Sequence, residues 1–266
     1  MGRDVVFVAS THTDEALLEL YRVGCALAGY GVRRVTCAIP FLGYSTMERA
    51  VKPGEVVTAK TIARQLSIMP SGDLRNAFLM MDLHVSDFVH DFESNCLRFE
   101  LYAEKILVET MNKLHWCDDP KNTVFASADL GRPMWVRSFA DKFGTGMAMV
   151  NKRRNGGQTE ITEVIGDVRD KSVVIYDDMV RSGGSLVNAA NAYLNCGASK
   201  VNAVISHFAL NDDRAFARLI KSFPGRIITT NSHPMSQNLG SINPLNEIIV
   251  ADVSGVFAEA IRKIIV

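Results

Sequence analysis

The 266-residue sequence predicts an α/β fold made of two doubly wound, parallel-sheet domains. Short apolar segments rich in β-branched residues alternate with segments of helical periodicity along the whole chain. Most of these apolar segments are continuous rather than alternating, which favours parallel strands that are buried on both faces. In addition, residues 5–10 and 173–178 read as similar strands entering similar turns, which is typical of a duplicated α/β unit.

Residues 1–118 are predicted to form the first domain. Strands are expected at 4–10, 32–40 and 76–82, and helices at 14–28 and 58–66, with a glycine-rich mixed segment at 41–57. The Thr-His-Thr-Asp sequence before the first helix is a suitable helix start. Ligands of doubly wound sheets bind beyond the carboxyl ends of the strands, where four polar side chains fall, namely His12, Tyr44, Arg49 and His84.

Residues 119–266 are predicted to form the second domain. Strands are expected at 123–127, 146–151, 173–176, 201–207, 226–230 and 247–251. Helices are expected at 134–143, 186–195, 212–222 and 253–264. The last helix is also a candidate for packing on the first domain.

Composition narrows the class of protein. The 29 Lys and Arg residues balance the 29 Asp and Glu residues, so no overall field attracts nucleic acid or an anionic membrane. The five cysteines are odd in number, scattered and without Cys-x-x-Cys spacing, which is typical of reduced thiols. Without a signal peptide or a long apolar span, the sequence predicts a soluble, cytoplasmic protein with no nucleic-acid or membrane partner.

Residues 172–186 carry the most informative pattern. A buried-type strand ends in the acidic pair Asp177 and Asp178, and a glycine-containing loop then leads into a helix. The two carboxylates can accept hydrogen bonds from vicinal hydroxyls, while loop N–H groups and the hydroxyls of Ser182 and Ser185 can hold a phosphate. The segment therefore indicates a cradle for a sugar phosphate. The alternative is an ordinary strand end and turn, where Asp, Ser and Gly are common for local reasons.

This segment resembles the ribose-5-phosphate loop of type I phosphoribosyltransferases and phosphoribosyl pyrophosphate (PRPP) synthetases, and nearly the whole chain resembles the synthetases. The matching motifs follow the family's order and spacing. They are Met81-Asp82-Leu83-His84, Leu101-Tyr102-Ala103-Glu104, Ser127-Ala128-Asp129-Leu130-Gly131, Asn151-Lys152-Arg153-Arg154, residues 177–185, Gly197-Ala198, Ser206-His207 and Thr230-Asn231-Ser232. The resemblance implies two domains of phosphoribosyltransferase type. Residues 7–13 and 180–185 are similar to the phosphate-independent, plant-type class.

The resemblance implies a ribose-phosphate diphosphokinase, which transfers the β,γ-diphosphoryl group of ATP to O1 of ribose 5-phosphate and releases AMP. It also implies Mg²⁺ as cofactor and assembly into a homo-oligomer. Lys152 and Arg154 match the two catalytic basic residues of a mobile loop, and Asn155-Gly156-Gly157 suits such a lid. The alternative for Lys152-Arg153-Arg154 is a solvated surface run.

Other matched positions imply binding roles. Arg49 and His84 match nucleotide-binding positions, and His84 and Asp129 match positions that hold the magnesium nucleotide. The ribose-5-phosphate site is matched by Asp177, Asp178, Arg181, Ser182, Gly183, Gly184 and Ser185.

Two features depart from the family pattern. Family members normally open with a further strand, helix and hairpin that help to bind the nucleotide, and this sequence begins where that segment ends. The common class has Arg-Gln-Asp in the ATP segment, where this chain has Thr46-Met47-Glu48 before Arg49. Both departures concern the nucleotide side and leave the sugar-phosphate motif intact.

Three alternative functions stay open. A diphosphokinase could act on ADP-ribose or another 5-substituted ribose, with Arg181 contacting the additional phosphate. A non-catalytic paralogue could regulate true synthetases. The missing opening segment favours this alternative, whereas the retained Lys152, Arg154, His84, Asp129 and acidic pair argue against it. A phosphoribosyltransferase that consumes PRPP would share the loop, but the two-domain layout does not suit it.

Overall fold

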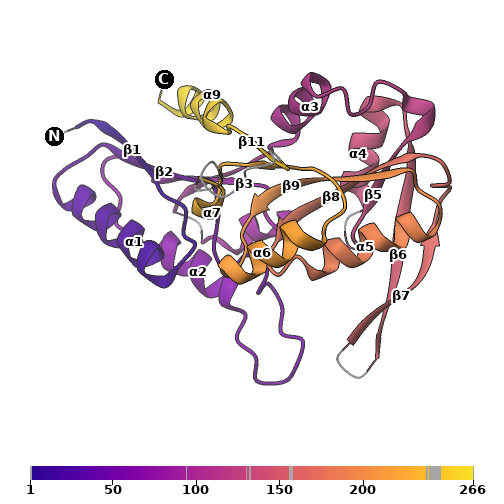
Figure 1. Cartoon of the computed structure of the whole chain (residues 1–266). Helices are drawn as coiled ribbons and strands as arrows, with labels where there is room; N and C mark the ends of the chain where they lie inside the picture. Colours follow the sequence, from indigo (N-terminus) through magenta and orange to yellow (C-terminus); the bar gives the residue numbers. More distant parts are fainter. Residues whose placement is uncertain are drawn as a thin grey trace. The chain divides into compact units, whose positions relative to one another are not determined.

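The computed structural model describes residues 2–93, 95–129, 131, 133–155, 158–237, 239 and 247–265, with side chains except at 153–162 and 237. The chain divides into two compact units, each described by itself below (Figure 1). The first unit comprises Met1–Ala103, Ser232–Pro234 and Asp252–Val266, and the second comprises Glu104–Asn231 and Met235–Ala251.

The first unit contains a four-stranded, wholly parallel sheet in the order β1-β2-β3-β4. Its strands are β1 (Asp4–Val8), β2 (Arg34–Ile39), β3 (Ala77–Met81) and β4 (Leu97–Leu101). Its helices are α1 (Asp14–Gly29), α2 (Thr58–Ser67), the 3₁₀ helix η1 (Ser86–Asp91) and α9 (Ser254–Ile264). Thr13 caps α1 by accepting the Ala16 N–H, so the predicted helix start is confirmed.

Burial in the first sheet is greatest in the inner strands β2 and β3. Every residue of β3 is buried, whereas β1 is only half-buried and Val8 is 63% exposed. Residues 4–10 form one of the continuous apolar segments that favour burial on both faces, and for β1 this expectation is wrong. Within the described part of the chain β1 pairs only with β2, so it is an edge strand despite its continuous apolar sequence.

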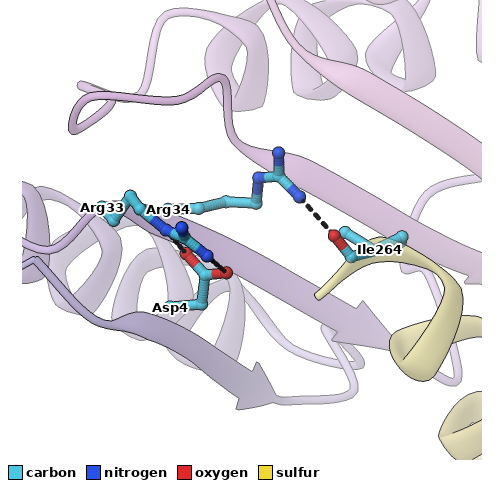
Figure 2. A network of polar contacts seen from close by, with 4 residues as sticks. All are labelled: Asp4, Arg33, Arg34 and Ile264. Carbon is cyan, nitrogen blue, oxygen red and sulfur yellow. Dashed lines mark hydrogen bonds and ion pairs between the residues drawn. The ribbon is translucent and has the colours of Figure 1, made fainter. Parts of the chain in front are cut away.

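A polar network fastens α9 to the first sheet (Figure 2). At the start of β2, the Arg33 guanidinium contacts both carboxylate oxygens of Asp4, at 2.9 and 2.6 Å. The next residue, Arg34, donates from Nη1 to the Ile264 carbonyl oxygen at 2.7 Å. This carbonyl belongs to the last turn of α9, where a cation satisfies an acceptor with no intrahelical partner and interacts favourably with the helix dipole. Arg34 therefore caps the C-terminus of α9.

Replacing Arg34 with methionine is expected to loosen α9 while keeping the packing of the aliphatic stem. Loss of a charged hydrogen bond costs about 1–2 kcal/mol, so amide exchange within α9 should accelerate about tenfold. Hydrogen–deuterium exchange measured on peptides covering α9 tests this. The matched control is Arg262→Met, because Arg262 is exposed and, among the described residues, bonds only within its own helix, to Ala258. Equal exchange rates in the two variants would contradict the capping role.

The second unit contains a seven-stranded sheet in the order β11-β10-β9-β8-β5-β6-β7, parallel except for the antiparallel pair β6–β7. The strands are β5 (Thr123–Ser127), β6 (Gly146–Asn155), β7 (Gln158–Ile165), β8 (Ser172–Val180), β9 (Lys200–Phe208), β10 (Ile227–Thr230) and β11 (Ile248–Ala251). The helices are α3 (Glu104–Lys113), η2 (Pro120–Asn122), α4 (Pro133–Phe143), α5 (Gly184–Asn195) and α6 (Asp213–Ser222). The short α7 (Pro234–Gln237) begins at the unit boundary.

Helices cover both faces of the second sheet (Figure 1). On one face, Phe139 of α4 packs against Phe125 and Tyr176, with ring centroids 5.6 and 4.8 Å apart. On the other face, Leu186 and Tyr193 of α5 join a buried cluster with strand residues of the opposite parity, including Val173 and Ile175. The predicted doubly wound arrangement is thus confirmed for this unit.

The two compact units divide the chain differently from the predicted boundary between 118 and 119. Helix α3 falls in the second unit because it contacts β10 and β11, and Glu104 binds Ser138 and Lys142 of α4. Helix α9 falls in the first unit, where Arg34 binds its last turn.

Two of the described strands, β4 and β7, were not predicted. Strand β4 has mixed polarity, and β7 is largely polar, so neither shows a continuous apolar run. The strand expected at 146–151 continues to Asn155 because β7 pairs with its distal half. Among the described residues, no helix is long and apolar enough to cross a membrane.

Candidate functional site

The strand order of the second sheet reverses at β5. From β5 the chain moves to β6 on one side, and then returns to β8 on the other side of β5. Ligands of open α/β sheets bind beyond the carboxyl ends of strands at such a reversal. Here β5 leads to Asp129, and the carboxyl end of β8 carries Asp177 and Asp178. Three predicted site residues therefore flank the reversal.

Lys152 of β6 lies close to two of these carboxylates. Partial burial lowers the pKa of Lys152 below its usual 10.5, while the nearby charges of Asp129 and Asp177 oppose that shift. The structure thus brings Lys152, Asp129 and Asp177 together from three adjacent strands. A lysine at this edge can neutralise charge on a ligand that carries high negative charge.

The acidic pair occupies two environments. Strand β8 continues to Val180, four residues beyond the predicted strand end at 176, so successive side chains point to opposite faces. Asp178 is 3% exposed, whereas Asp177 is half-buried and accepts the Asp178 N–H at 3.0 Å through Oδ1. Two carboxylates at one strand end can serve two different hydroxyls of one sugar, which fits the predicted role of the pair.

The loop after β8 is shaped by Gly183. Its φ of +78° lies in the left-handed region, and an added Cβ would lie 3.1 Å from Leu219 Cδ1. Helix α5 begins at Gly184, earlier than the predicted 186, its N-cap Gly183 has no side chain to cap it, and the Gly184 N–H donates to Ser182 Oγ at 3.4 Å. The first N–H groups of a helix have no intrahelical partner, so those of α5 can receive an anion, with the exposed hydroxyls of Ser182 and Ser185 nearby in sequence.

Substituting Gly183 with alanine is expected to damage this loop. Left-handed backbone costs about 1–2 kcal/mol for a residue with Cβ, and the contact with Leu219 adds to that cost, so the melting temperature should fall by about 4 °C. Differential scanning calorimetry measures the change. The control is Gly184→Ala, since an added Cβ there meets only Ser182 Oγ at 3.8 Å. A similar melting temperature for both variants would contradict the strained-backbone account.

Asp129 offers an open carboxylate. The side chain is exposed, and its Oδ1 accepts the Gly131 N–H at 2.7 Å. Its Oδ2 makes no hydrogen bond to a described residue, and a carboxylate oxygen is a ligand that Mg²⁺ prefers. The Ser127 hydroxyl donates to the Asp129 carbonyl oxygen, which orders the turn after β5. Asp129 therefore fits the predicted metal position.

The first unit holds His84 at the carboxyl end of β3. Asp82 adopts φ +42°, is 3% exposed, and accepts the Ala103 N–H at 3.2 Å. Glu100 of β4 accepts the Leu83 N–H at 3.2 Å and so supports the same turn. Asp82 and Glu100 therefore orient the segment that carries the half-buried His84. Sequence reasoning missed Glu100, because nothing in its local pattern marks it as a support.

Other predicted residues of the first unit gather at the same edge of its sheet. His12 lies with its ring centroid 5.5 Å from that of His233, and His233 packs against Phe41 at 4.7 Å. The Tyr44 hydroxyl donates to Asp14, and this hydrogen bond raises the pKa of Tyr44. Arg49 is exposed in an irregular segment, 3.5 Å from Glu48. Tyr44 and His12 thus lie beyond strand ends, as expected.

Part of the predicted site lies outside the described residues. The backbone of Arg154 belongs to β6, but its side chain lies outside the described part of the structure. Gly156 and Gly157 lie wholly outside it. Arg181 is exposed at the end of β8, and its carbonyl oxygen accepts the Asn211 N–H at 3.0 Å. Within the described part of the chain, no three His, Cys, Asp or Glu side chains converge to hold a metal.

A parallel sheet with a reversed strand order, an acidic pair and a helix that starts from a glycine-containing loop defines a class of α/β proteins suited to phosphorylated ligands. Residues 1–69 match the N-terminal domain of ribose phosphate pyrophosphokinase, and residues 148–266 match the phosphoribosyl synthetase-associated domain. The ribose-phosphate pyrophosphokinase of Campylobacter jejuni is 30% identical over 266 residues, covering 99% of this chain and 81% of that protein. That of Clostridium tetani is 32% identical, covering 99% and 79%.

The fold of the chain is also similar to that of a solved structure. The crystal structure of phosphoribosylpyrophosphate synthetase from Mycobacterium smegmatis superimposes with a TM-score of 0.84 at 24% identity, covering 99% of this chain and 82% of that one. The chain belongs to the ribose-phosphate pyrophosphokinase family. The predicted family, α/β fold and diphosphokinase class are confirmed, while the roles of individual residues stay predictions.

Proposed function

We propose that this chain transfers the diphosphoryl group of ATP to O1 of ribose 5-phosphate, giving PRPP and AMP. The convergence of Lys152, Asp129 and Asp177 at the strand reversal, beside the α5 N-terminus, carries this proposal. It places a cation, a candidate metal ligand and a candidate hydroxyl acceptor in one unit. Transfer of a diphosphoryl group between two phosphorylated substrates requires such groups.

Ribose 5-phosphate binds at the carboxyl end of β8. Its 5-phosphate lies on the loop and the first N–H groups of α5, with Ser182, Gly183, Gly184 and Ser185 forming the cradle. Asp177 and Asp178 accept hydrogen bonds from the ring hydroxyls. This arrangement holds the sugar by both ends and leaves its 1-hydroxyl free to react.

The reaction forms one bond and breaks one. The 1-hydroxyl oxygen bonds to the β-phosphorus of ATP, the bond from that phosphorus to the α,β-bridging oxygen breaks, and AMP leaves. The hydroxyl proton is released to solvent. Lys152 neutralises charge on the transferred diphosphoryl group, and Arg154 supplies a second cation from the same strand.

Mg²⁺ is the proposed cofactor, and Asp129 and His84 are each proposed, from the family resemblance, as residues that bind the magnesium nucleotide. When bound, the ion neutralises phosphate charge and orients the nucleotide. Asp129 keeps one carboxylate oxygen available, and Asp82 and Glu100 fix the turn that carries His84. Arg49 is proposed as a further nucleotide contact.

Finer features are proposed from the same resemblance. Residues 7–13 and 180–185 support membership of the phosphate-independent, plant-type class. We also propose a homo-oligomer in the cytoplasm, with ATP and ribose 5-phosphate as ligands and no nucleic-acid or membrane partner. The balanced net charge supports the last point.

A second candidate substrate is ADP-ribose, in which a diphosphate ester replaces the terminal phosphate. Arg181 favours it, because its exposed guanidinium makes no hydrogen bond or ion pair among the described residues. A cation next to the cradle can bind the additional phosphate.

AMP formation from ATP and Mg²⁺ tests the choice of acceptor. Ribose 5-phosphate, ADP-ribose and no acceptor are compared, and each sugar product is identified by mass. The proposal expects AMP and PRPP with ribose 5-phosphate. A preference for ADP-ribose would assign the alternative substrate, and AMP from neither acceptor, with folded protein, would favour the regulatory paralogue.

A further inference from the structure

A buried tyrosine connects the cradle helix to the strand that leads to Asp129. Tyr193 lies on α5, two turns or more from the helix start, and its side chain is fully buried. Its hydroxyl donates to the Ser127 carbonyl oxygen at 2.7 Å. Ser127 is the last residue of β5, so this hydrogen bond joins α5, the helix that follows β8, to the carboxyl end of β5.

The connection continues from Ser127 to Asp129. The Ser127 hydroxyl donates to the Asp129 carbonyl oxygen, and the Asp129 carboxylate accepts the Gly131 N–H at 2.7 Å. Burial, together with the nearby negative charge of Asp129, raises the pKa of Tyr193. The hydroxyl of Tyr193 therefore lies near the candidate metal ligand, yet it is held by a backbone carbonyl and faces no solvent.

The apolar part of Tyr193 does not need its hydroxyl in order to pack. The ring belongs to a buried cluster with Leu186, Ala189 and strand residues of the sheet. Phenylalanine would fill the same space, so the hydroxyl adds one interaction, the fixation of the carboxyl end of β5. A hydrogen bond at this place restricts the segment from which the Asp129 side chain projects.

We infer that Tyr193 is a positioning residue, whose hydroxyl holds the end of β5 so that Asp129 is correctly placed for the magnesium nucleotide. This rests on the proposed function, which gives Asp129 its ligand. We expect the bond to act on the nucleotide side, because its acceptor Ser127 leads to Asp129, whereas the loop at 181–185 lies eight or more residues before Tyr193 in the chain. Loss of the hydroxyl should therefore affect the two substrates unequally.

The test is a comparison of two binding constants in Tyr193→Phe, measured by isothermal titration calorimetry on the full chain. Mg·ADP probes the nucleotide side without turnover, and ribose 5-phosphate probes the cradle. We expect Mg·ADP to bind about five- to tenfold more weakly, as loss of one buried hydrogen bond implies, with ribose 5-phosphate affinity unchanged. ADP without Mg²⁺ should lose less affinity than Mg·ADP.

Tyr176→Phe is the matched control. Tyr176 is also buried in the second unit, and its hydroxyl lies 3.4 Å from Ser206 Oγ, on the face covered by α4. It should leave both affinities within twofold of the original chain. Melting temperatures of both variants, measured in parallel, report any general loss of folding.

Three outcomes would overturn the inference. Unchanged Mg·ADP affinity in Tyr193→Phe would show that the hydroxyl does not position Asp129. Equal weakening of both ligands together with a lower melting temperature would show a merely structural role. Failure of the unsubstituted chain to bind Mg·ADP or ribose 5-phosphate would contradict the proposed function as well as the inference. The unsubstituted chain therefore distinguishes failure of the proposed function from failure of the inference alone.

Discussion

Lys152→Ala is expected to lower kcat about 100- to 1,000-fold while changing the KM for ribose 5-phosphate less than about threefold. Lys152 interacts electrostatically with both Asp129 and Asp177, and we propose that it neutralises charge that develops during transfer. The sugar phosphate, by contrast, is held by β8 and α5. Steady-state kinetics with varied ribose 5-phosphate measure the two parameters separately.

The control for this substitution is Lys171→Ala. Lys171 belongs to the same unit, but it pairs with the exposed Asp167 at 2.9 Å, before β8 begins. Its loss should leave kcat within about twofold. A comparable loss of kcat in both lysine variants, or a large KM effect in Lys152→Ala, would contradict the assignment.

The lowered pKa of Lys152 predicts how kcat/KM changes at alkaline pH. Because partial burial lowers the pKa of Lys152 below 10.5, its positive charge is lost at a lower pH than that of an exposed lysine. The free enzyme's kcat/KM should therefore fall as pH rises through this lowered pKa. Lys152→Arg keeps its charge there, so its remaining activity should lack this limb. An identical limb in both proteins would assign it to another group.

Asp178→Asn is expected to raise the KM for ribose 5-phosphate about 10- to 100-fold, with kcat changed only a few-fold. Asparagine keeps the size of the side chain but loses the charge, and hydrogen bonds to charged groups contribute about 1.5–3 kcal/mol. Asp178 is 3% exposed at the end of β8, so solvent cannot replace the lost interaction. Binding of ribose 5-phosphate alone, measured by calorimetry, checks that KM reports affinity.

Asp167→Asn is the control for Asp178. Asp167 is an exposed carboxylate of the same unit, paired with Lys171 away from the acidic pair. It should leave KM within about twofold. Equal losses of kcat and of affinity in Asp178→Asn would contradict a separate role in sugar binding.

Continuous apolar segments made much of the second sheet predictable. Strand β5 has the predicted bounds, and β8, β9 and β10 differ by a few residues at most at their carboxyl ends. Strand β7 could not be predicted in this way, because its polar sequence pairs with the distal half of β6. The same reasoning failed for β1, whose apolar sequence indicates burial although edge position decides its exposure.

The site residues also divide into those that the sequence could predict and those that it could not. Asp177, Asp129 and Lys152 stand in local motifs, so sequence alone could mark them. Tyr193 and Glu100 could not be marked, because each acts through a contact distant in sequence: Tyr193 with Ser127, and Glu100 with Leu83. Their chemistry depends on which strands become neighbours, and that information lies in the tertiary fold.

The most direct test of the central claim is to follow the phosphates of ATP. The chain is incubated with ribose 5-phosphate, Mg²⁺ and ATP labelled either in the α-phosphate or in the β-phosphate, and the products are separated. The account predicts that α-label appears in AMP and β-label in a ribose product carrying a diphosphate at O1. Release of label as inorganic phosphate or pyrophosphate, with unmodified ribose 5-phosphate, would contradict diphosphoryl transfer.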